Sequence, residues 1–249
     1  MAAPIVSPPL VYCHGLPGGS PEWAACAPPG LAAFAPDRNR PVSAAALAAQ
    51  VRAAFGQGPV TLIGFSLGAP IALALARELG EQAGHIHLVS PAAPLQLGDF
   101  LNAMAGGPLF RLAGSRPTLF RLVARIESVI ARAAPRFLFG RLFASAVGED
   151  AALARDPAFR TAMAQVLRSG LGSDWRGFAG EVAAYVNDWR GALGHVSAPV
   201  TIWQGEADNW TPPAMAEALA AALPGPVTLH RLPGCSHYSA LRTALAQLA

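Results

Sequence analysis

The sequence contains no lysine, since all 18 of its basic residues are arginine. Charged residues make up only 13% of the 249 residues, about half the share of an average globular protein. With 53% apolar residues, the chain does not have the composition of a disordered protein. Much of that apolar share is alanine, at 53 residues, which fills little core volume. The length allows one large α/β domain, or one domain with a sizeable insertion.

Long apolar runs are also missing. The longest, such as residues 67–76, are too short to span a membrane and contain Gly or Pro. Residues 1–15 have no basic region before an apolar core and no small-residue cleavage site, so they are not typical of a signal peptide. We therefore expect a cytoplasmic protein without a transmembrane segment.

Cysteine is scarce as well. The three cysteines, Cys13, Cys26 and Cys235, are an odd number and lack metal-type spacing. This pattern favours neither a disulfide framework nor a metal site. The net charge of +3 does not indicate nucleic-acid binding.

The arginines are unevenly placed. Seven lie in residues 111–141 together with one acid, Glu127, which gives this stretch a net charge of +6 and leaves −3 for the rest. The pattern favours a solvated arginine face on an amphipathic helix. Two other interpretations stay open: attraction of an anionic substrate or acidic partner such as an acyl carrier, and contact with a membrane surface.

Short apolar runs alternate with helical patterns along most of the chain. The predicted strands are residues 9–15, 31–37, 59–66, 85–91, 198–208 and 226–234, and the predicted helices are residues 42–56, 67–80, 212–223 and 238–249. Such alternation predicts an α/β fold with a mostly parallel sheet flanked by helices.

The middle of the chain breaks the alternation. Residues 95–194 show helical patterns interrupted by proline, no convincing strand, and eight of the eleven phenylalanines. We predict a core formed by residues 1–94 and 195–249. The segment 95–194 is predicted to be a helical lid over the carboxyl ends of the strands.

The motif "GFSLG" at residues 64–68 fits G-x-S-x-G and lies between a predicted strand and a predicted helix. In that context the serine occupies a strained turn and its hydroxyl stands at a helix N-terminus. Ser66 is therefore the candidate nucleophile. The competing interpretation is an ordinary glycine-rich turn.

A second glycine-rich stretch, "HGLPGGS" at residues 14–20, follows the first predicted strand. Backbone N–H groups in such a loop can stabilise an oxyanion together with the N–H after the nucleophile. Leu16 and Leu67 are the residues in those positions. A phosphate-binding loop is the weaker alternative, because G-x-G-x-x-G and a following Gly-Lys-Ser/Thr are both absent.

A serine nucleophile needs a base and an acid that orients it. Asp208 follows one predicted strand and His237 follows the last one, so the order Ser66, Asp208, His237 places all three at the carboxyl edge of a parallel sheet. Glu206 competes with Asp208, which we prefer because it lies deeper in its loop.

The other candidates are weaker. Among the remaining histidines, His14 is interpreted as support for the glycine-rich loop, and His85, His87, His195 and His230 as structural. Cys235 lacks a nucleophile turn and is interpreted as packing.

Together these motifs resemble the α/β-hydrolase superfamily, in its lid-bearing esterase and lipase branch. The resemblance implies Ser66 as nucleophile, His237 as base, Asp208 as orienting acid, Leu16 and Leu67 as oxyanion donors, and neither metal nor organic cofactor. It also implies a sheet shortened at its N-terminal edge, because only nine residues precede "LVYCHG".

The function predicted is hydrolysis of a carboxylic ester or thioester with a mainly apolar acyl part. The same residues could instead serve an acyltransferase or perhydrolase. A catalytically silent binding protein of the same fold is the third possibility.

Overall fold

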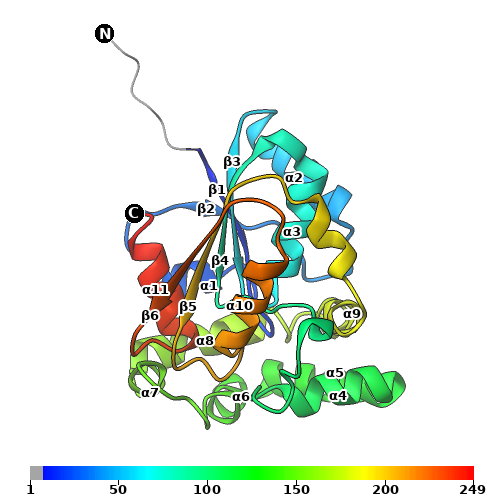
Figure 1. The fold of residues 1–249 in the computed structure, drawn as a ribbon. Helices are drawn as coiled ribbons and strands as arrows, with labels where there is room; N and C mark the ends of the chain where they lie inside the picture. Colours follow the sequence, from blue (N-terminus) through cyan, green and yellow to red (C-terminus); the bar gives the residue numbers. More distant parts are fainter. Residues whose placement is uncertain (1–7) are drawn as a thin grey trace.

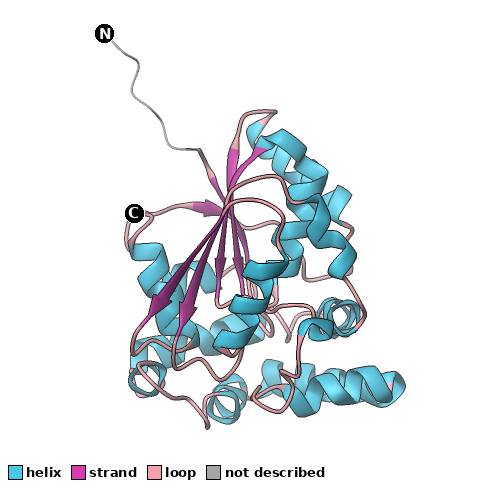
Figure 2. Cartoon of the chain, viewed as in Figure 1, coloured by secondary structure: helices cyan, strands magenta, loops and turns pink. Residues whose placement is uncertain are grey.

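The computed structural model describes residues 8–249 and contains one six-stranded sheet (Figures 1 and 2). The strand order is β2-β1-β3-β4-β5-β6, and every neighbouring pair is parallel. The strands are β1 (Leu10–Cys13), β2 (Ala33–Phe34), β3 (Val60–Phe65), β4 (Ala83–Val89), β5 (Val200–Gly205) and β6 (Val227–Leu232). The predicted parallel α/β sheet is confirmed.

The central strands are rich in apolar residues because both faces of the sheet are covered. In β3, five of the six residues are buried. Residues 1–7, which belong to the stretch interpreted as lacking a signal peptide, lie outside the described part.

Helices cover both faces of the sheet. Helices α1 and α11 lie on one face, and α2, α3 and α10 on the other (Figure 1). Their bounds are α1 (Glu22–Cys26), α2 (Ala44–Phe55), α3 (Gly68–Leu79), α10 (Pro213–Ala222) and α11 (His237–Ala246). The sequence patterns had predicted four of these five, and the five-residue α1 was too short to be recognised.

The ends of α2 and α3 follow local signals. The Ser43 hydroxyl accepts a hydrogen bond from the Ala46 amide at 3.2 Å and caps α2. Gly56 and Gly80 end the two helices with positive φ values of 67° and 59°, a conformation that glycine adopts without a Cβ clash.

All regular secondary structure in residues 95–194 is helical, and the segment contributes no strand to the described sheet. Its α-helices are α4 (Gly107–Ser115), α5 (Pro117–Ala133), α6 (Pro135–Leu142), α7 (Asp150–Leu153), α8 (Pro157–Ser169) and α9 (Trp175–Val186). Figure 2 shows α5 to α8 beyond the arrowheads of β5 and β6. Short 3₁₀ turns lie at both ends of the segment, at Leu95–Leu97 and Arg190–His195, and a third lies between α3 and β4 at Gly80–Gln82.

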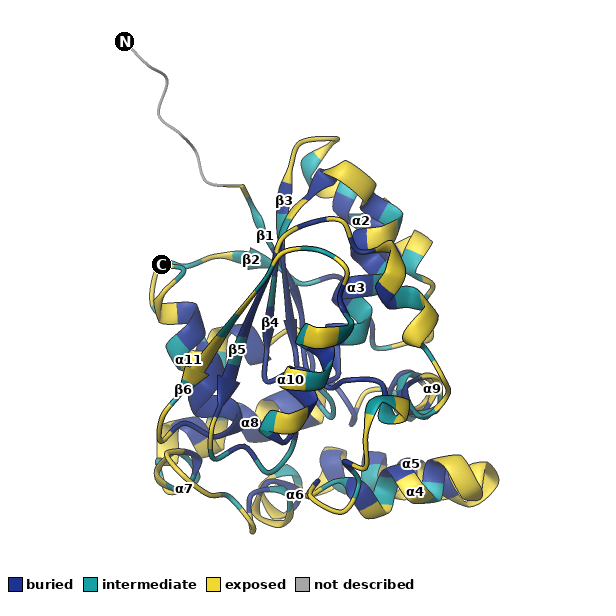
Figure 3. Ribbon diagram, in the orientation of Figure 1, coloured by how far each residue is buried: buried dark blue, intermediate teal, exposed yellow. Residues whose placement is uncertain are grey.

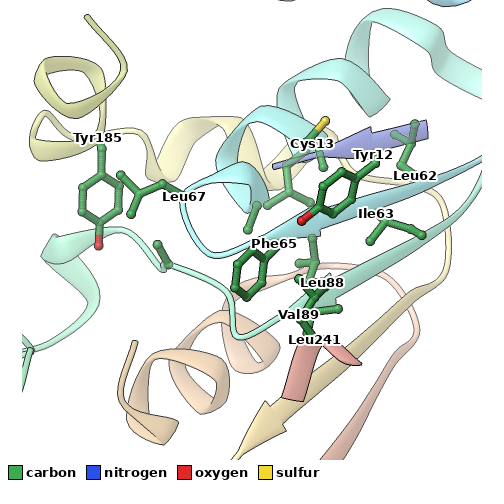
Figure 4. Close-up of a cluster of buried hydrophobic side chains, with 14 of the residues drawn as sticks. Tyr12, Cys13, Leu62, Ile63, Phe65, Leu67, Leu88, Val89, Tyr185 and Leu241 are labelled. Atoms are coloured by element: carbon green, nitrogen blue, oxygen red, sulfur yellow. The ribbon is translucent and has the colours of Figure 1, made fainter. Parts of the chain in front are cut away.

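Buried apolar side chains form a single cluster that runs from the sheet into this helical segment (Figure 3). Figure 4 shows Phe65 and Leu67, at the end of β3, between the sheet and Tyr185 of α9. The Tyr185 hydroxyl donates to the Ala93 carbonyl at 3.1 Å. The segment therefore shares its core with the sheet.

A buried ion pair also joins the two parts. Arg38, which follows β2, donates from Nε to Glu181 of α9 at 3.0 Å, and its Nη1 donates to the His14 carbonyl at 3.0 Å. The Arg38 side chain is fully buried. Removing one partner of such a pair leaves a buried charge without compensation.

None of the helices within residues 8–249 combines the length and the apolar character needed to cross a membrane.

We predict that Arg38→Met lowers the free energy of unfolding by about 3 kcal/mol, because Glu181 loses its partner. The matched control is Arg190→Met. It breaks an exposed pair with Asp188 and should have a much smaller effect, because water screens exposed ion pairs. Chemical denaturation measures both, and equal effects of the two substitutions would show that the buried pair does not join the parts.

Candidate active site

Ser66 occupies a strained turn between β3 and α3. Its φ is 54°, a left-handed conformation that is uncommon for a residue with a side chain. The Ser66 amide donates to the Val89 carbonyl at 3.0 Å, and the Ser66 carbonyl accepts from Ala92 at 3.1 Å. These bonds to the end of β4 and the chain that follows it hold the turn in place.

The glycines of "GFSLG" make room for this turn. A Cβ on Gly68 would overlap the Cys13 carbonyl oxygen of β1, and a Cβ on Gly64 would come within 2.9 Å of the Ala69 Cα. Both positions therefore require glycine, which explains the spacing of the motif in physical terms.

Asp208 and His237 meet beside this turn. His237 Nδ1 lies 2.8 Å from Asp208 Oδ2, and both side chains are buried. Burial alone would raise the pKa of Asp208, but His237 and the hydrogen bonds from His237 and Thr211 lower it below its ordinary value. Asp208 is therefore an ionised acceptor for the imidazole.

Neighbouring groups fix the pair. The Trp210 and Thr211 amides donate to Asp208 Oδ1 at 2.8 and 3.0 Å. The Trp210 ring stacks on the His237 ring with centroids 5.2 Å apart. The Thr211 hydroxyl donates to the carbonyl of Ser90, which is itself strained, with a φ of 44°.

The Ser66 hydroxyl forms no hydrogen bond with another described residue, and its link to His237 is not closed in this structure. Ser66 is 3% exposed and lines a cavity. Catalytic hydrogen bonds are often long before substrate binds and tighten in the complex.

The two candidate oxyanion donors line the same cavity as Ser66. Leu16 follows β1 and Leu67 directly follows Ser66. Within residues 8–249, neither amide nitrogen donates to another backbone or side-chain atom. The structure thus brings Ser66, Leu16 and Leu67 to one cavity, and places Asp208 and His237 beside its wall residues Trp210 and Thr211.

The cavity has a volume of about 180 Å³ and is largely apolar. Most of its wall comes from the helical segment, through Met104, Ala105, Gly106, Leu109, Phe110, Arg141, Leu142, Ser145, Phe178 and Val182. A second cavity of about 430 Å³ shares Leu109, Leu142 and Phe178 with it and extends to Val123 and Ala124 of α5. The two cavities therefore adjoin each other between Ser66 and α5, and the outer one is also lined by Arg141 and Glu127.

Asp150, which the sequence analysis did not single out, anchors the loop of His237. Its carboxylate accepts hydrogen bonds from the amides of His237, Tyr238 and Ser239 at 3.2, 2.9 and 2.7 Å. Asp150 begins α7 in the helical segment and is 1% exposed. It places a negative charge at the N-terminus of α11, where the helix dipole favours one.

Glu22 is a second buried carboxylate that sequence reasoning missed. It accepts from the Gly15 amide at 3.0 Å and from the Tyr12 and Tyr238 hydroxyls at 2.6 and 3.3 Å. Burial raises the pKa of Glu22, although the donors from Tyr12 and Gly15 oppose this. Glu22 ties the loop of Leu16 to the residue after His237.

Neither carboxylate had a usable signal in the sequence. Asp150 stands in "GEDAALARD" and Glu22 in "GSPEWAAC", where each looks like an ordinary acid in the first turn of a helix. Their partners come from residues far along the chain or on another element, and only the folded arrangement reveals them.

The other acid and the cysteine lie apart from the Asp208–His237 pair. Glu206 is exposed and does not contact His237. Burial raises the pKa of the Cys235 thiol, whose Sγ lies 3.6 Å from Glu149 and from Thr243. A protonated thiol in such surroundings is a poor nucleophile.

No histidine is among the residues that line the cavity at Ser66. His87 of β4 and His230 of β6 lie beside the ring of Trp203 on β5, and His85 packs on His87. His195 is exposed. His14 is buried and bonded to the Gly15 carbonyl at 2.9 Å. Burial lowers the pKa of His14 to about 3, so it is neutral at pH 7.

Across residues 8–249, no cluster of three or more His, Cys, Asp or Glu side chains is suited to hold a metal ion.

Comparisons with known proteins identify the family and the fold. The family model for the alpha/beta hydrolase fold matches residues 34–242. No match to a curated protein sequence was found.

Solved structures similar to the chain include a thermophilic esterase from Thermogutta terrifontis, with a TM-score of 0.65, 18% identity, and coverage of 98% of this chain and 88% of that one. An enol-lactonase from Burkholderia xenovorans has a TM-score of 0.64, 19% identity, and 97% and 88% coverage. A putative non-heme bromoperoxidase from Mycobacterium tuberculosis has a TM-score of 0.64, 17% identity, and 97% and 91% coverage. At these identities the likeness concerns the fold alone.

We predict that Asp150→Asn lowers the free energy of unfolding by about 2 kcal/mol, because three amides lose a charged acceptor. The matched control is Asp156→Asn, at the cap of α8. That change should cost a few tenths of a kcal/mol, since Asn caps helices as well as Asp does. Denaturant unfolding measures the stability of both variants. An Asp150→Asn variant as stable as Asp156→Asn would contradict the anchoring role.

Proposed function

Because the chain belongs to the α/β-hydrolase family, we propose that it is a serine hydrolase that cleaves a carboxylic ester or thioester. The observation that carries the proposal is the buried Asp208–His237 hydrogen bond beside the strained Ser66. A buried Asp–His pair next to a serine that lines a cavity is the arrangement that activates a hydroxyl for acyl transfer.

In the proposed first step, Ser66 Oγ attacks the carbonyl carbon of the substrate while His237 Nε2 takes the hydroxyl proton. Asp208 holds Nδ1–H and stabilises the imidazolium. The amides of Leu16 and Leu67 are placed to donate to the developing oxyanion, and each such donor is worth roughly 3 kcal/mol.

In the second half, His237 donates this proton to the departing alcohol or thiol, and the acyl group remains bonded to Ser66 Oγ. Water then attacks the acyl carbonyl while His237 removes a proton from the water. The bond between the acyl carbon and Ser66 Oγ breaks, Oγ takes the proton back from His237, and the carboxylic acid leaves. The same acyl-enzyme reacts with another alcohol or with hydrogen peroxide in an acyltransferase or perhydrolase. An assay with these acceptors separates the outcomes.

The cavity walls support a mainly apolar acyl group. Of the arginines in residues 111–141, Arg141 lines the inner cavity, and it already pairs with Glu127 at 3.0 Å. This pairing reduces its value as an anchor for an anionic substrate. We propose that the helical segment 95–194 serves as the lid, because it supplies most of the wall that faces Ser66.

The names of two similar solved structures guide the choice of substrates to test. One is an esterase and another an enol-lactonase. The substrate panel for this chain therefore contains open-chain esters, thioesters and lactones.

We expect Ser66→Ala and His237→Ala to lower kcat/KM for p-nitrophenyl esters by at least about 10³-fold, because both substitutions remove the activated nucleophile. Asp208→Asn should lower it by about 10²-fold or more, since the imidazole loses its orienting charge.

Glu206→Gln is the matched control for Asp208→Asn, and it should change kcat/KM by less than about twofold. Steady-state kinetics measure all four variants. Full turnover by Ser66→Ala, or a larger loss in Glu206→Gln than in Asp208→Asn, would rule out the assignment.

Acyl length should depend on the passage between the two cavities. Leu142 lines both, so Leu142→Trp narrows that passage. We expect kcat/KM for an octanoate ester to fall about tenfold, because its chain loses apolar contacts beyond the narrowed passage and each methylene in an apolar pocket is worth roughly 1 kcal/mol. The value for an acetate ester, whose acyl group does not reach the passage, should change less than twofold.

Leu119→Trp, at an exposed position on α5, is the control and should leave both values unchanged. Equal losses on acetate and octanoate in Leu142→Trp would show that the acyl chain does not follow this path.

A further inference from the structure

Helix α5 exposes an apolar stripe on its outer side. Leu119, Leu122, Ile126 and Val129 are 41%, 53%, 50% and 58% exposed. Spacings of three, four and three residues place them on one face of the helix. Single exposed apolar residues are ordinary on protein surfaces, but an aligned row of four is not.

The stripe is not the face that α5 turns to the protein. That role belongs to Phe120, Ala124, Ser128 and Ala131, which are buried. Figure 3 shows α5 at the rim of the molecule, far from the sheet, with exposed residues along its outer side. The helix is therefore apolar on two separate faces, and one of them faces outward.

Arginines run beside the stripe. A helix turns about 100° per residue, so Arg121, Arg125 and Arg132 form a second exposed row next to the apolar one. At the start of α6, Arg136 and Phe137 continue the same combination, with Phe137 60% exposed.

The acid of this stretch does not offset these charges. Glu127 is the single acid of residues 111–141, and it pairs with Arg141 rather than with the row on α5. The surface thus combines an apolar stripe with uncompensated positive charge.

We propose that this surface, α5 with the start of α6, docks on a membrane that carries anionic lipids. The apolar stripe would enter the boundary between headgroups and acyl chains while the arginines contact lipid phosphates. Exposed residues of α5 outside the stripe are arginines, Pro117, Thr118 and Ala133, so every charged side chain that the helix exposes there is positive.

A second copy of the chain fits this surface less well. Face-to-face pairing would bring two stretches of net charge +6 together. An anionic bilayer supplies both the apolar environment and the opposite charge.

The docking surface and the catalytic cavity share a helix. Val123 and Ala124 of α5 line the outer cavity, which shares lining residues with the cavity at Ser66. Docking through α5 would therefore place the helix that lines the outer cavity against lipid. The inference itself requires no hydrolysis and does not rest on the proposed function.

The test uses the full chain carrying Ser66→Ala, so that lipid hydrolysis cannot disturb it. Flotation is measured with vesicles of phosphatidylcholine alone and with vesicles that contain 30% phosphatidylglycerol. We expect binding to the anionic vesicles that weakens as salt rises, and at least tenfold less binding to the neutral ones.

Two variants remove the two halves of the surface. Leu122→Gln with Ile126→Gln removes the stripe, and Arg121→Gln with Arg125→Gln removes the charge. Each pair should lower binding at least fivefold, and thermal melts verify that these exposed substitutions leave the fold intact.

The matched control is Arg77→Gln with Arg231→Gln, which removes two exposed arginines outside residues 111–141 and should leave binding unchanged. The proposal is overturned if anionic vesicles do not bind the chain, or if the control weakens binding as much as the α5 variants. It is also overturned if sedimentation shows a dimer that Leu122→Gln with Ile126→Gln dissociates.

Discussion

The turn at Ser66 is the constraint on which the rest of the site depends. At this point a buried strand reverses into a buried helix with no intervening loop, and the residue at the apex takes a φ of 54°. The turn is possible only because Gly64 and Gly68 leave room for α3 to pass close to the carbonyl of Cys13. Backbone hydrogen bonds to Val89 and Ala92 over-determine it. In the proposed mechanism the same closeness puts the Leu67 amide next to the hydroxyl.

Around that fixed point, two buried carboxylates hold the segments that contain Leu16 and His237. Asp150 gathers the amides at the start of α11, and Glu22 gathers the Gly15 amide with two tyrosine hydroxyls. Asp150 comes from the helical segment, while His237 belongs to the sheet domain. The position of the imidazole therefore depends on how that segment is docked.

Much of the fold could be read from the sequence because its signals are local. Strands β3 and β5 are short, mainly apolar runs, and Ser43, Gly56 and Gly80 mark helix ends by their own chemistry. The order of Ser66, Asp208 and His237 along strand ends was enough to predict that all three lie at one edge, since parallel strands present their carboxyl ends there. Asp208 and His237 are in contact at that edge.

What the sequence could not supply depends on contacts between distant residues. Asp150 and Glu22 are unremarkable in their own segments, and their importance comes from amides and hydroxyls up to 216 positions away. Helix α1 has only five residues, too few for a periodic pattern. The arginine stretch gave three interpretations because periodicity alone does not say which apolar face of α5 is covered. The structure does, and it leaves Leu122 and Ile126 outside.

The central claim is that Ser66 is the activated nucleophile, and covalent labelling tests it most directly. Cleavage after arginine releases residues 53–77, a peptide in which Ser66 is the only serine. After treatment with a fluorophosphonate, mass spectrometry should find one adduct per chain, on this peptide, and none in His237→Ala on the same time scale. An adduct on another residue of the folded protein, or undiminished labelling without His237, would contradict the account.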